Sequence, residues 1–316
     1  MKYCVGADIG GTTIKLGIID EEGALISKWE IPTRKGENGL LFMKDIADEI
    51  RKAFAEKEDI SMEEDVLGVG IGIPGPVLPD GYVEVCVNLD VKDIYPAKLL
   101  SDLLGGMPAK VANDANVAAL GEMWQGAGKG HDSICMVTLG TGVGGGIVNE
   151  GRIVPGTHGA GGELGHMRVV DDEPEQCNCG GHGCLEQYAS ATGIVRVAKR
   201  MMASCSDESR MREIEDLSAK DVCDLAKDGD ELALRSLSYS MDKLAFILSH
   251  IALATDPQVF VIGGGVSRAG TFLTDMISEA LGRYQSIIKA DKYDVALATL
   301  GNNAGIYGAA KLMFPD

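Results

Sequence analysis

Two glycine-rich turns, each between two apolar runs, constrain the fold of this chain more than any other feature. Residues 5–19 contain the first, a Gly-Gly-Thr-Thr turn at 10–13, and residues 134–148 contain the second, a Gly-Thr-Gly turn at 140–142. A strand, a glycine turn and a second strand predict a β-hairpin. Two similar hairpins so far apart in the sequence predict two related domains that face one cleft, although two unrelated hairpins would leave the same local pattern.

The rest of the chain alternates strand-like and helix-like runs, which predicts an α/β fold. Apolar residues at every fourth position predict an amphipathic helix between Phe42 and Phe54. Further helices are expected over residues 116–124, across 191–254 with an acidic interruption near 206–215, and around 272–281, and a buried strand is expected over 259–262.

Composition narrows the classes of ligand. The chain has 316 residues, 45% of them hydrophobic, so it can bury a core without disulfide bonds. Its 47 acidic residues exceed its 29 basic ones, and the resulting charge of −18 opposes binding to nucleic acid or anionic lipid. A strand-like run begins at Tyr3, which leaves no room for a signal peptide, and the longest apolar stretch, 244–254, is too short to span a membrane. We therefore expect a cytoplasmic protein that holds any anion by local dipoles or a metal.

The second glycine turn matches the dinucleotide fingerprint G-x-G-x-x-G, but a strand rather than a helix follows it, which argues against a Rossmann site. A glycine hairpin can instead gather several backbone N–H groups around one anion, because glycine has no Cβ and allows unusual backbone angles. A carboxylate beside that anion needs a cation between them, and Mg²⁺ is the usual choice. The predicted site for Mg²⁺-bound polyphosphate consists of Asp8, Gly10, Gly11, Thr12, Thr13, Thr141 and Gly142. Alternatively, Asp8 is an ordinary acidic residue of a turn and the glycines serve only the tight packing of the hairpins. Lys15 is expected to point away from the turn.

Three of the eight cysteines, Cys177, Cys179 and Cys184, lie in one glycine-rich loop with His166 a little upstream. Three thiolates and one imidazole form a complete tetrahedral set for zinc with no open position, which predicts a structural metal site. A redox disulfide is the alternative, and a reducing cytoplasm disfavours it. His182, in the same loop, is expected to face solvent, and the other five cysteines to be reduced and packed.

Polar residues beside this cluster suit a sugar. Glu186 follows Cys184 by two residues, and Glu163 and His166 are three residues apart, so one helical turn would put them on one face. If one ring nitrogen of His166 binds zinc, the other is free to donate to a ligand. Glu163, His166 and Glu186 are predicted to form a polar wall for sugar hydroxyls, and ordinary surface charge is the alternative for both glutamates.

Asn113 and Asp114 follow a short apolar strand and precede a helix, a junction that points side chains into a cleft. Phosphoryl transfer to a hydroxyl needs positioning, charge neutralisation and a base near the attacking oxygen. We predict that Asp114 is this base and that Asn113 holds a neighbouring sugar hydroxyl. Alternatively, Asp114 only caps the following helix.

Together these segments resemble the ROK family (repressors, open reading frames and kinases). The resemblance rests on residues 8–15, 70–77, 113–116, 138–145, 163–166 and 177–186, which run in the family's order. It implies a two-domain actin-like, ribonuclease-H-like ATPase fold. The first domain would comprise residues 1–112 with a returning C-terminal segment, 303–316, and the second would comprise 113–302.

The same resemblance implies ATP-dependent phosphorylation of D-glucose at its 6-hydroxyl, with Asp114 taking the proton. It implies Mg²⁺ and ATP as cofactors, the same four zinc ligands, and a homodimer or larger assembly. Gly75 and Asn88 would line the sugar pocket, unless Pro74-Gly75-Pro76 is only a rigid turn. Gly264 and Gly265 would form the adenosine motif, unless they are only a tight strand-to-helix turn.

Three other functions carry similar motifs. A kinase for N-acetylmannosamine, fructose or allose would differ only in its sugar pocket. A sugar-responsive repressor would carry a helix-turn-helix ahead of the first phosphate motif, and Asp8 already lies in that motif. A catalytically silent sugar sensor is opposed by the intact Asp8, Asp114 and glycine turns.

Overall fold

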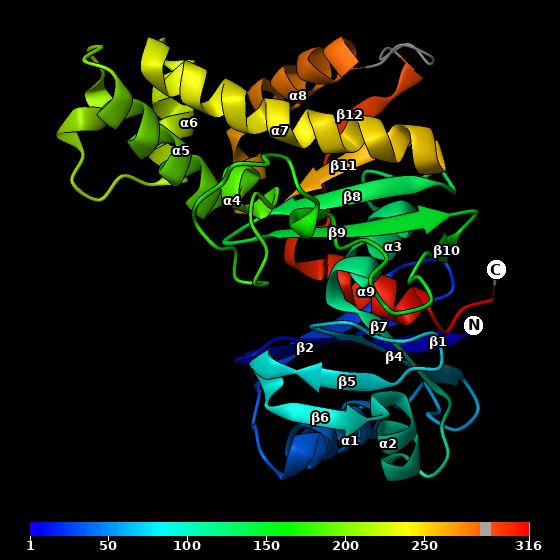
Figure 1. Ribbon diagram of the computed structural model, residues 1–316. Coiled ribbons are helices and arrows are strands. Elements are labelled where there is room, and N and C mark those ends of the chain that lie inside the picture. The colour runs from blue at the N-terminus through cyan, green and yellow to red at the C-terminus, as the bar shows by residue number, and fades with distance from the viewer. Residues whose placement is uncertain (285–291, 316) are drawn as a thin grey trace. The chain divides into compact units, whose positions relative to one another are not determined.

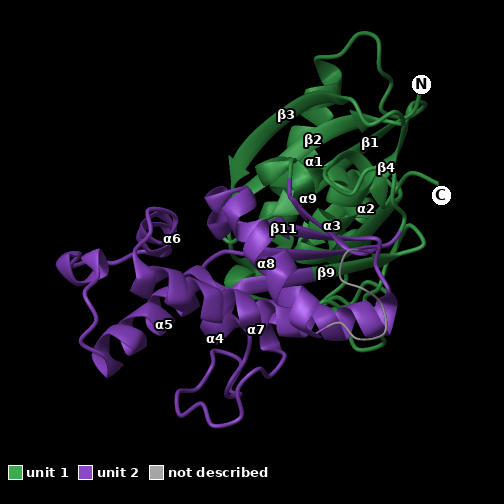
Figure 2. Ribbon diagram, turned by 90° about the horizontal axis from the view of Figure 1, so that it is seen from above, with its two compact units in different colours: residues 1–132, 146–162, 299–316 green, residues 133–145, 163–298 purple. Residues whose placement is uncertain are grey.

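The computed structural model describes residues 1–284 and 292–315 of the chain (Figure 1). Its contacts divide it into two compact units, which are coloured separately in Figure 2. Unit 1 contains residues 1–132, 146–162 and 299–316, and unit 2 contains residues 133–145 and 163–298. The domain boundaries expected from the sequence, after residue 112 and before residue 303, stay a prediction. Asp114, which falls in the second expected domain, belongs to unit 1 in this division by contacts.

A five-stranded sheet forms the centre of unit 1, in the order β3-β2-β1-β4-β7. Its strands are β1 (Tyr3–Ile9), β2 (Thr13–Asp20), β3 (Leu25–Pro32), β4 (Val66–Ile73) and β7 (Ala109–Asn113). Strands β1, β2 and β3 pair antiparallel, whereas β4 runs parallel to both β1 and β7. The first predicted hairpin is therefore confirmed as the β1–β2 pair.

Successive side chains of β1 point to opposite faces of this sheet. Val5, Ala7 and Ile9 pack into a hydrophobic core with helix α1 (Leu40–Ala55), which confirms the predicted amphipathic helix. On the other face lies helix α9 (Ala304–Lys311), so close that a Cβ at Gly6 would lie 1.9 Å from the carbonyl oxygen of Ile306. Figure 1 shows α1 and α9 on opposite sides of the strands. Only glycine allows this approach of a helix backbone to the sheet.

Helix α3 (Asp114–Gln125) packs against α9 in the same way. A Cβ at Gly121 would lie 2.2 Å from the carbonyl oxygen of Ala304, and one at Gly308 would lie 1.6 Å from that of Val117. Outside the second sheet described below, the remaining elements of unit 1 are η1 (Glu37–Gly39), β5 (Val83–Cys86), η2 (Val87–Leu89), β6 (Val91–Ile94), α2 (Pro96–Leu103) and η7 (Gly301–Asn303).

Glu122, in the last turn of α3, is 0% exposed. Its carboxylate accepts hydrogen bonds from the backbone N–H groups of Ala127 (2.8 Å), Thr299 (3.1 Å) and Leu300 (2.8 Å). Among the described residues no lysine or arginine forms an ion pair with it. Since a buried carboxylate is costly unless donors surround it, these N–H groups fix the segment that leads into α9.

A second five-stranded sheet has the order β10-β9-β8-β11-β12. Its strands are β8 (Ile134–Leu139), β9 (Val143–Asn149), β10 (Arg152–Ile153), β11 (Val259–Gly263) and β12 (Asp294–Leu297). Strand β9 begins in unit 2 and ends in unit 1, where β10 follows. The second predicted hairpin is confirmed because β8 and β9 are neighbours in this sheet.

The helices of unit 2 follow the predicted order. They are η3 (Leu164–His166), α4 (Glu186–Ala189), α5 (Ala191–Ser204), η4 (Arg210–Glu213), α6 (Ala219–Lys227), α7 (Glu231–Thr255), η5 (Gly265–Ala269) and α8 (Thr271–Tyr284). The acidic interruption expected near 206–215 separates α5 from α6. The predicted strand at 259–262 and helix around 272–281 are confirmed as β11 and α8, whereas α3 begins two residues before its predicted start.

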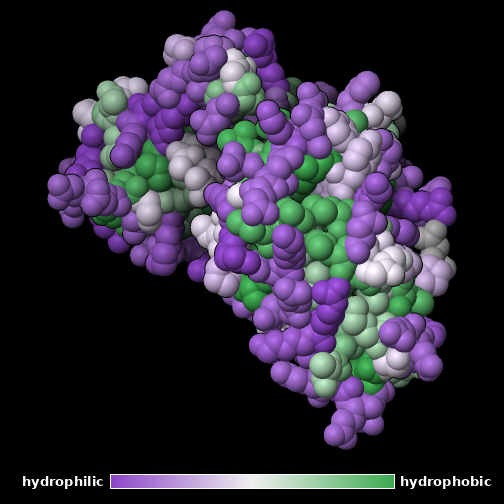
Figure 3. Space-filling view, turned by 90° about the horizontal axis from the view of Figure 1, so that it is seen from below, coloured by the Kyte–Doolittle hydropathy of each residue, from purple (hydrophilic) through white to green (hydrophobic). Residues whose placement is uncertain are grey.

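Hydrophilic side chains cover much of the face drawn in Figure 3, with smaller apolar areas between them. Among the described residues, none of the helices has the length and apolar character needed to cross a lipid bilayer.

Replacing Glu122 with alanine is expected to lower the free energy of unfolding by about 2–4 kcal/mol, because three N–H groups lose a charged acceptor. Urea denaturation at neutral pH measures the effect. Glu56→Ala, at the exposed end of α1, is the control and should change stability by less than about 0.5 kcal/mol. Equal midpoints for Glu122→Ala and the parent chain would contradict the anchoring role.

Candidate functional site

The turn between β1 and β2 is closed by backbone hydrogen bonds. The N–H of Gly10 donates to the carbonyl of Thr13 (3.0 Å), and the hydroxyl of Thr33 donates to the carbonyl of Gly10 (2.7 Å). Neither Gly10 nor Gly11 has a positive φ, so the expectation of unusual backbone angles is wrong for this turn. Glycine is needed at position 10 because a side chain would not fit, since a Cβ there would lie 2.9 Å from the carbonyl oxygen of Thr13.

The second turn is tied to the helices that follow the cysteine loop. The N–H of Ala191 donates to the carbonyl of Gly140 (2.8 Å), and the hydroxyl of Thr192 donates to that of Thr141 (2.9 Å). Gly140 and Gly142 also lack a positive φ. A Cβ at Gly142 would lie 2.2 Å from Oε2 of Glu186, so glycine here makes room for a carboxylate.

Asp8 lies in β1 directly opposite Lys15 in β2. Residues paired across an antiparallel ladder point to the same face, and Nζ of Lys15 lies 3.8 Å from Oδ2 of Asp8. The prediction that Lys15 points away from the turn is therefore wrong. Burial raises the pKa of the Asp8 carboxyl, and the Lys15 ammonium opposes that shift.

Asn113, rather than Asp114, is the N-cap of α3. Its Oδ1 accepts from the N–H groups of Ala115 (2.9 Å) and Asn116 (3.1 Å). Its Nδ2 donates to the carbonyl of Gly75 (3.1 Å) and to Oδ1 of Asp114 (3.1 Å). These four bonds use both N–H groups and both oxygen lone pairs of the amide, so a bond to a sugar hydroxyl would have to replace or share one of them. The sugar contact of Asn113 stays a prediction. The alternative that Asp114 only caps the helix loses its basis.

Asp114 and Asp8 flank the same glycine of β4. A Cβ at Gly72 would lie 3.7 Å from Cα of Asp114 and 3.8 Å from Oδ1 of Asp8. Oδ1 of Asp114 also accepts from the N–H of Ala115 (2.8 Å). From the other side, Gly305 of α9 leaves room for Asp8, since a Cβ there would lie 2.6 Å from the carboxyl carbon. The structure thus brings the two predicted acids together within unit 1.

Gly75 and Asn88 lie beside these residues in unit 1. Gly75 has a φ of 90°, a backbone conformation that favours glycine. The carbonyl of Asn88, in η2, would lie 3.4 Å from a Cβ at Gly11. Asn88 is therefore next to the first glycine turn.

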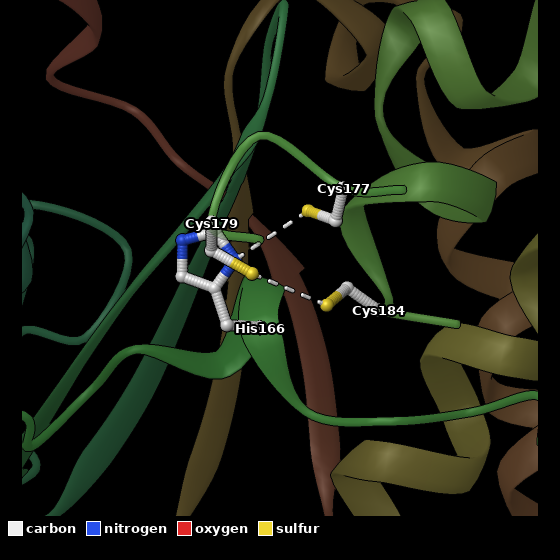
Figure 4. A group of neighbouring side chains, drawn as sticks. All are labelled: His166, Cys177, Cys179 and Cys184. Atoms are coloured by element: carbon white, nitrogen blue, oxygen red, sulfur yellow. Dashed lines mark hydrogen bonds between the residues drawn. The ribbon is translucent and has the colours of Figure 1, made fainter. Parts of the chain in front are cut away.

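His166, Cys177, Cys179 and Cys184 point toward one another (Figure 4). Their ligand atoms all lie within 4.8 Å of one another, with Sγ of Cys177 3.9 Å from Nδ1 of His166 and Sγ of Cys179 3.6 Å from that of Cys184. In a tetrahedral zinc site with Zn–S bonds of about 2.3 Å, sulfur atoms lie roughly 3.8 Å apart. The donor set and its spacing therefore fit zinc.

The polar residues predicted beside the cluster lie next to it. Nε2 of His166 faces Oε2 of Glu163 at 4.0 Å, on the side of the ring away from Cys177. Oε1 of Glu186 lies 3.8 Å from Sγ of Cys177, and its Oε2 accepts from the N–H of Val143 (3.1 Å). Glu186 thus connects the cysteine cluster to the strand that follows the second glycine turn. His182 is only half-exposed, and its Nδ1 lies 3.0 Å from the carbonyl of Glu173.

The glycines after β11 differ in role. Gly264 has a φ of 84°, and a Cβ there would lie 2.5 Å from the carbonyl oxygen of Leu139, so it forms a tight turn. Gly265 lines a pocket of about 330 Å³ within unit 2. The other lining residues are Ala191, Ser218, Ala219, Lys220, Cys223, Asp224, Val266, Arg268 and Ala269.

Sequence reasoning missed the pocket-lining residues in the range 218–224. It also missed Lys15 and Gly305 as the neighbours of Asp8. The Asp8–Lys15 pairing was readable, because the two residues are placed symmetrically about the turn. The lining of the pocket by residues 218–224 could not be predicted, because these residues lie far from Gly265 in sequence. No local pattern marks Gly305 as a neighbour of Asp8.

Residues 4–315 match the ROK family. The chain is 40% identical over 316 residues to a glucokinase of Halalkalibacterium halodurans, an alignment that covers 99% of this chain and 95% of the relative. It is 30% identical over 322 residues to an N-acetyl-D-glucosamine kinase of Haemophilus influenzae, covering 97% and 98% of the two chains.

Solved structures give the same result. A ROK hexokinase from Thermus thermophilus matches with a TM-score of 0.81 and 32% identity, covering 98% of this chain and 97% of the other. A ROK family glucokinase from Streptomyces griseus, in complex with glucose and AMPPNP, matches with a TM-score of 0.72 and 34% identity, covering 98% of both chains. The predicted actin-like α/β fold is thereby confirmed, and the chain belongs to the ROK family.

Proposed function

We propose that this protein transfers the γ-phosphoryl group of ATP to the 6-hydroxyl of D-glucose. Its membership of the ROK family, with hexokinase and glucokinase relatives along the whole chain, makes it a hexose kinase, an ATP-dependent sugar phosphotransferase. The observation that carries the proposal is the convergence of Asp8 and Asp114 on Gly72. Asp8 suits the metal-bound phosphate, and Asp114 suits the attacking alcohol.

Asp114 is the proposed general base. As the 6-hydroxyl oxygen attacks the γ-phosphorus, the hydroxyl proton passes to the Asp114 carboxylate, and the bond to ADP breaks. Asn113 keeps the carboxylate oriented by donating to Oδ1, while its own amide oxygen caps α3. The carbonyl of Gly75 is held by the same amide, so Gly75 and Asp114 keep a fixed relation.

Asp8 is the proposed ligand of Mg²⁺, which would neutralise charge on the transferring phosphoryl group. Lys15 partly offsets the Asp8 charge at 3.8 Å, which favours the ionised carboxylate that a metal needs. The glycine turns with Thr12, Thr13 and Thr141 are the proposed phosphate contacts. The pocket beside Gly265 is the proposed adenosine site, because it is partly apolar and the turn after β11 forms part of its lining.

Glu163, His166 and Glu186 are the proposed contacts for the sugar hydroxyls. Structural zinc would be held by the three thiolates and Nδ1 of His166, leaving Nε2 of the ring to donate to a hydroxyl. The four ligands would hold the metal as a structural ion that keeps this polar wall in position, and it would supply no chemistry to the transfer. A homodimer and a cytoplasmic location remain predictions of the sequence.

A kinase for an N-acetylated hexose is the second candidate, because the relative from Haemophilus influenzae carries that name at 30% identity. The higher identity to a glucokinase, 40%, favours glucose. A coupled assay for ADP release across glucose, N-acetylglucosamine, N-acetylmannosamine, fructose and allose decides between them. We expect the highest kcat/KM with glucose, and turnover of an N-acetylated sugar alone would replace the proposal.

Asp114→Asn is expected to keep the fold and glucose affinity and to lower kcat by about 10²–10⁴-fold, the usual contribution of a general base. Steady-state kinetics with ATP and glucose give kcat, and calorimetric titration with glucose gives the affinity. A variant that turns over at the parent rate would remove Asp114 from the mechanism.

Asp8→Asn is expected to abolish most turnover and to raise the thermal midpoint at pH 7. Because the folded-state pKa of Asp8 is raised, mainly by burial, the ionised carboxylate destabilises the fold once pH exceeds its unfolded value of about 4. The gain in midpoint should vanish as pH falls below that value, where both forms are neutral. Asp102→Asn, on the exposed end of α2, serves as the control. A variant less stable than the parent at pH 7 would contradict this account.

A further inference from the structure

Gln187 has no part in the mechanism above, yet it is buried beside the cysteine cluster. It is the second residue of α4, next to Glu186, and is only 8% exposed. A buried amide is costly unless its hydrogen bonds are made, so its partners indicate what holds it there.

The side chain of Gln187 bonds to three backbone groups. Its Oε1 accepts from the N–H groups of Gly183 (2.9 Å) and Cys184 (3.1 Å), which uses both lone pairs of the oxygen. Its Nε2 donates to the carbonyl of Glu175 (2.9 Å). One amide therefore binds the N–H groups of two successive residues, Gly183 and Cys184, where the loop enters Cys184.

Glu175 is itself held firmly. Nη2 of Arg200 lies 2.6 Å from Oε1 of Glu175 and 2.8 Å from Oε1 of Glu173, and Nη1 of Arg196 lies 3.0 Å from Oε2 of Glu175. The Glu173 carboxylate is nearly inaccessible to solvent and also accepts from the hydroxyl of Tyr188. The segment around residues 173–175 is thus tied to α5 by these ion pairs, and Gln187 of α4 links this segment to the cysteine loop.

The loop leaves little room for another arrangement. Gly183 has a φ of 74°, and a Cβ there would lie 1.7 Å from the carbonyl oxygen of Val170. Its carbonyl accepts from the N–H of Val169 (2.7 Å). With Gly183 pinned on this side, the bond from its N–H to Gln187 decides how the chain enters Cys184.

We propose that Gln187 is a positioning residue that directs the thiolate of Cys184 toward the other three zinc ligands and, through the first turn of α4, holds Glu186. This inference rests on the zinc site of the proposed function and not on sugar phosphorylation. Residues that orient metal ligands typically change metal affinity by about 10–100-fold when they are replaced.

The test is the rate at which the zinc-loaded protein releases zinc to the chromophoric chelator 4-(2-pyridylazo)resorcinol. Gln187→Met keeps the length of the side chain and removes all three hydrogen bonds, and we expect release at least about 10-fold faster than from the parent chain. Gln187→Glu keeps an acceptor for the two N–H groups and loses the donor to Glu175, and we expect a smaller acceleration. The second variant serves if the first does not fold.

Gln176→Met is the matched control. Gln176 adjoins Cys177 in the same loop but is exposed, and its Nε2 donates to the carbonyl of Gly180 (2.9 Å). Release within about twofold of the parent is expected. Parent-like release from both variants at position 187, an equal acceleration by Gln176→Met, or a parent protein that holds no zinc would overturn the proposal. Because no sugar or ATP is used, a protein that holds zinc in this way but phosphorylates no hexose would refute only the proposed function.

Discussion

Direct backbone contact between helix α9 and the central sheet is the constraint on which the arrangement of unit 1 depends. Any side chain at Gly6 or Gly70 would overlap a carbonyl of α9, so the helix can lie this close only because both positions are glycine. That closeness brings Gly305 against the Asp8 carboxylate, and α3, packed on α9, carries Asp114 to the same place. The glycines of this chain thus position acids as well as form turns.

The buried Glu173 carboxylate pairs with Arg200, but three other buried or half-buried carboxylates accept hydrogen bonds from backbone N–H groups. Glu122 accepts from three of them, Glu186 from that of Val143, and Asp114 from that of Ala115. Oriented N–H dipoles stabilise a negative charge without adding a flexible cation. Asp8 differs, because it pairs with the ammonium of Lys15 at 3.8 Å, which fits a carboxylate that must remain available to a metal.

Local patterns predicted the hairpins, most helices and the cysteine cluster, because each depends on residues close together in sequence. The same reasoning failed where strand pairing or tertiary packing determines which residues are in contact. Lys15 reaches Asp8 because of the strand register, and Asn113 caps α3 because the helix begins two residues earlier than its apolar pattern. Gln187 was not singled out from the sequence, since its partners at Glu175 and Gly183 appear only in the folded loop.

The central claim is that Asp8 and Asp114 hold the two reacting partners on either side of Gly72. A crystal structure with glucose, Mg²⁺ and a non-hydrolysable ATP analogue tests it most directly. The account predicts the 6-hydroxyl oxygen within about 3.2 Å of an Asp114 carboxylate oxygen, and Mg²⁺ bound by Asp8 directly or through one water. A 6-hydroxyl bonded to a different base, or a metal held away from Asp8, would contradict it.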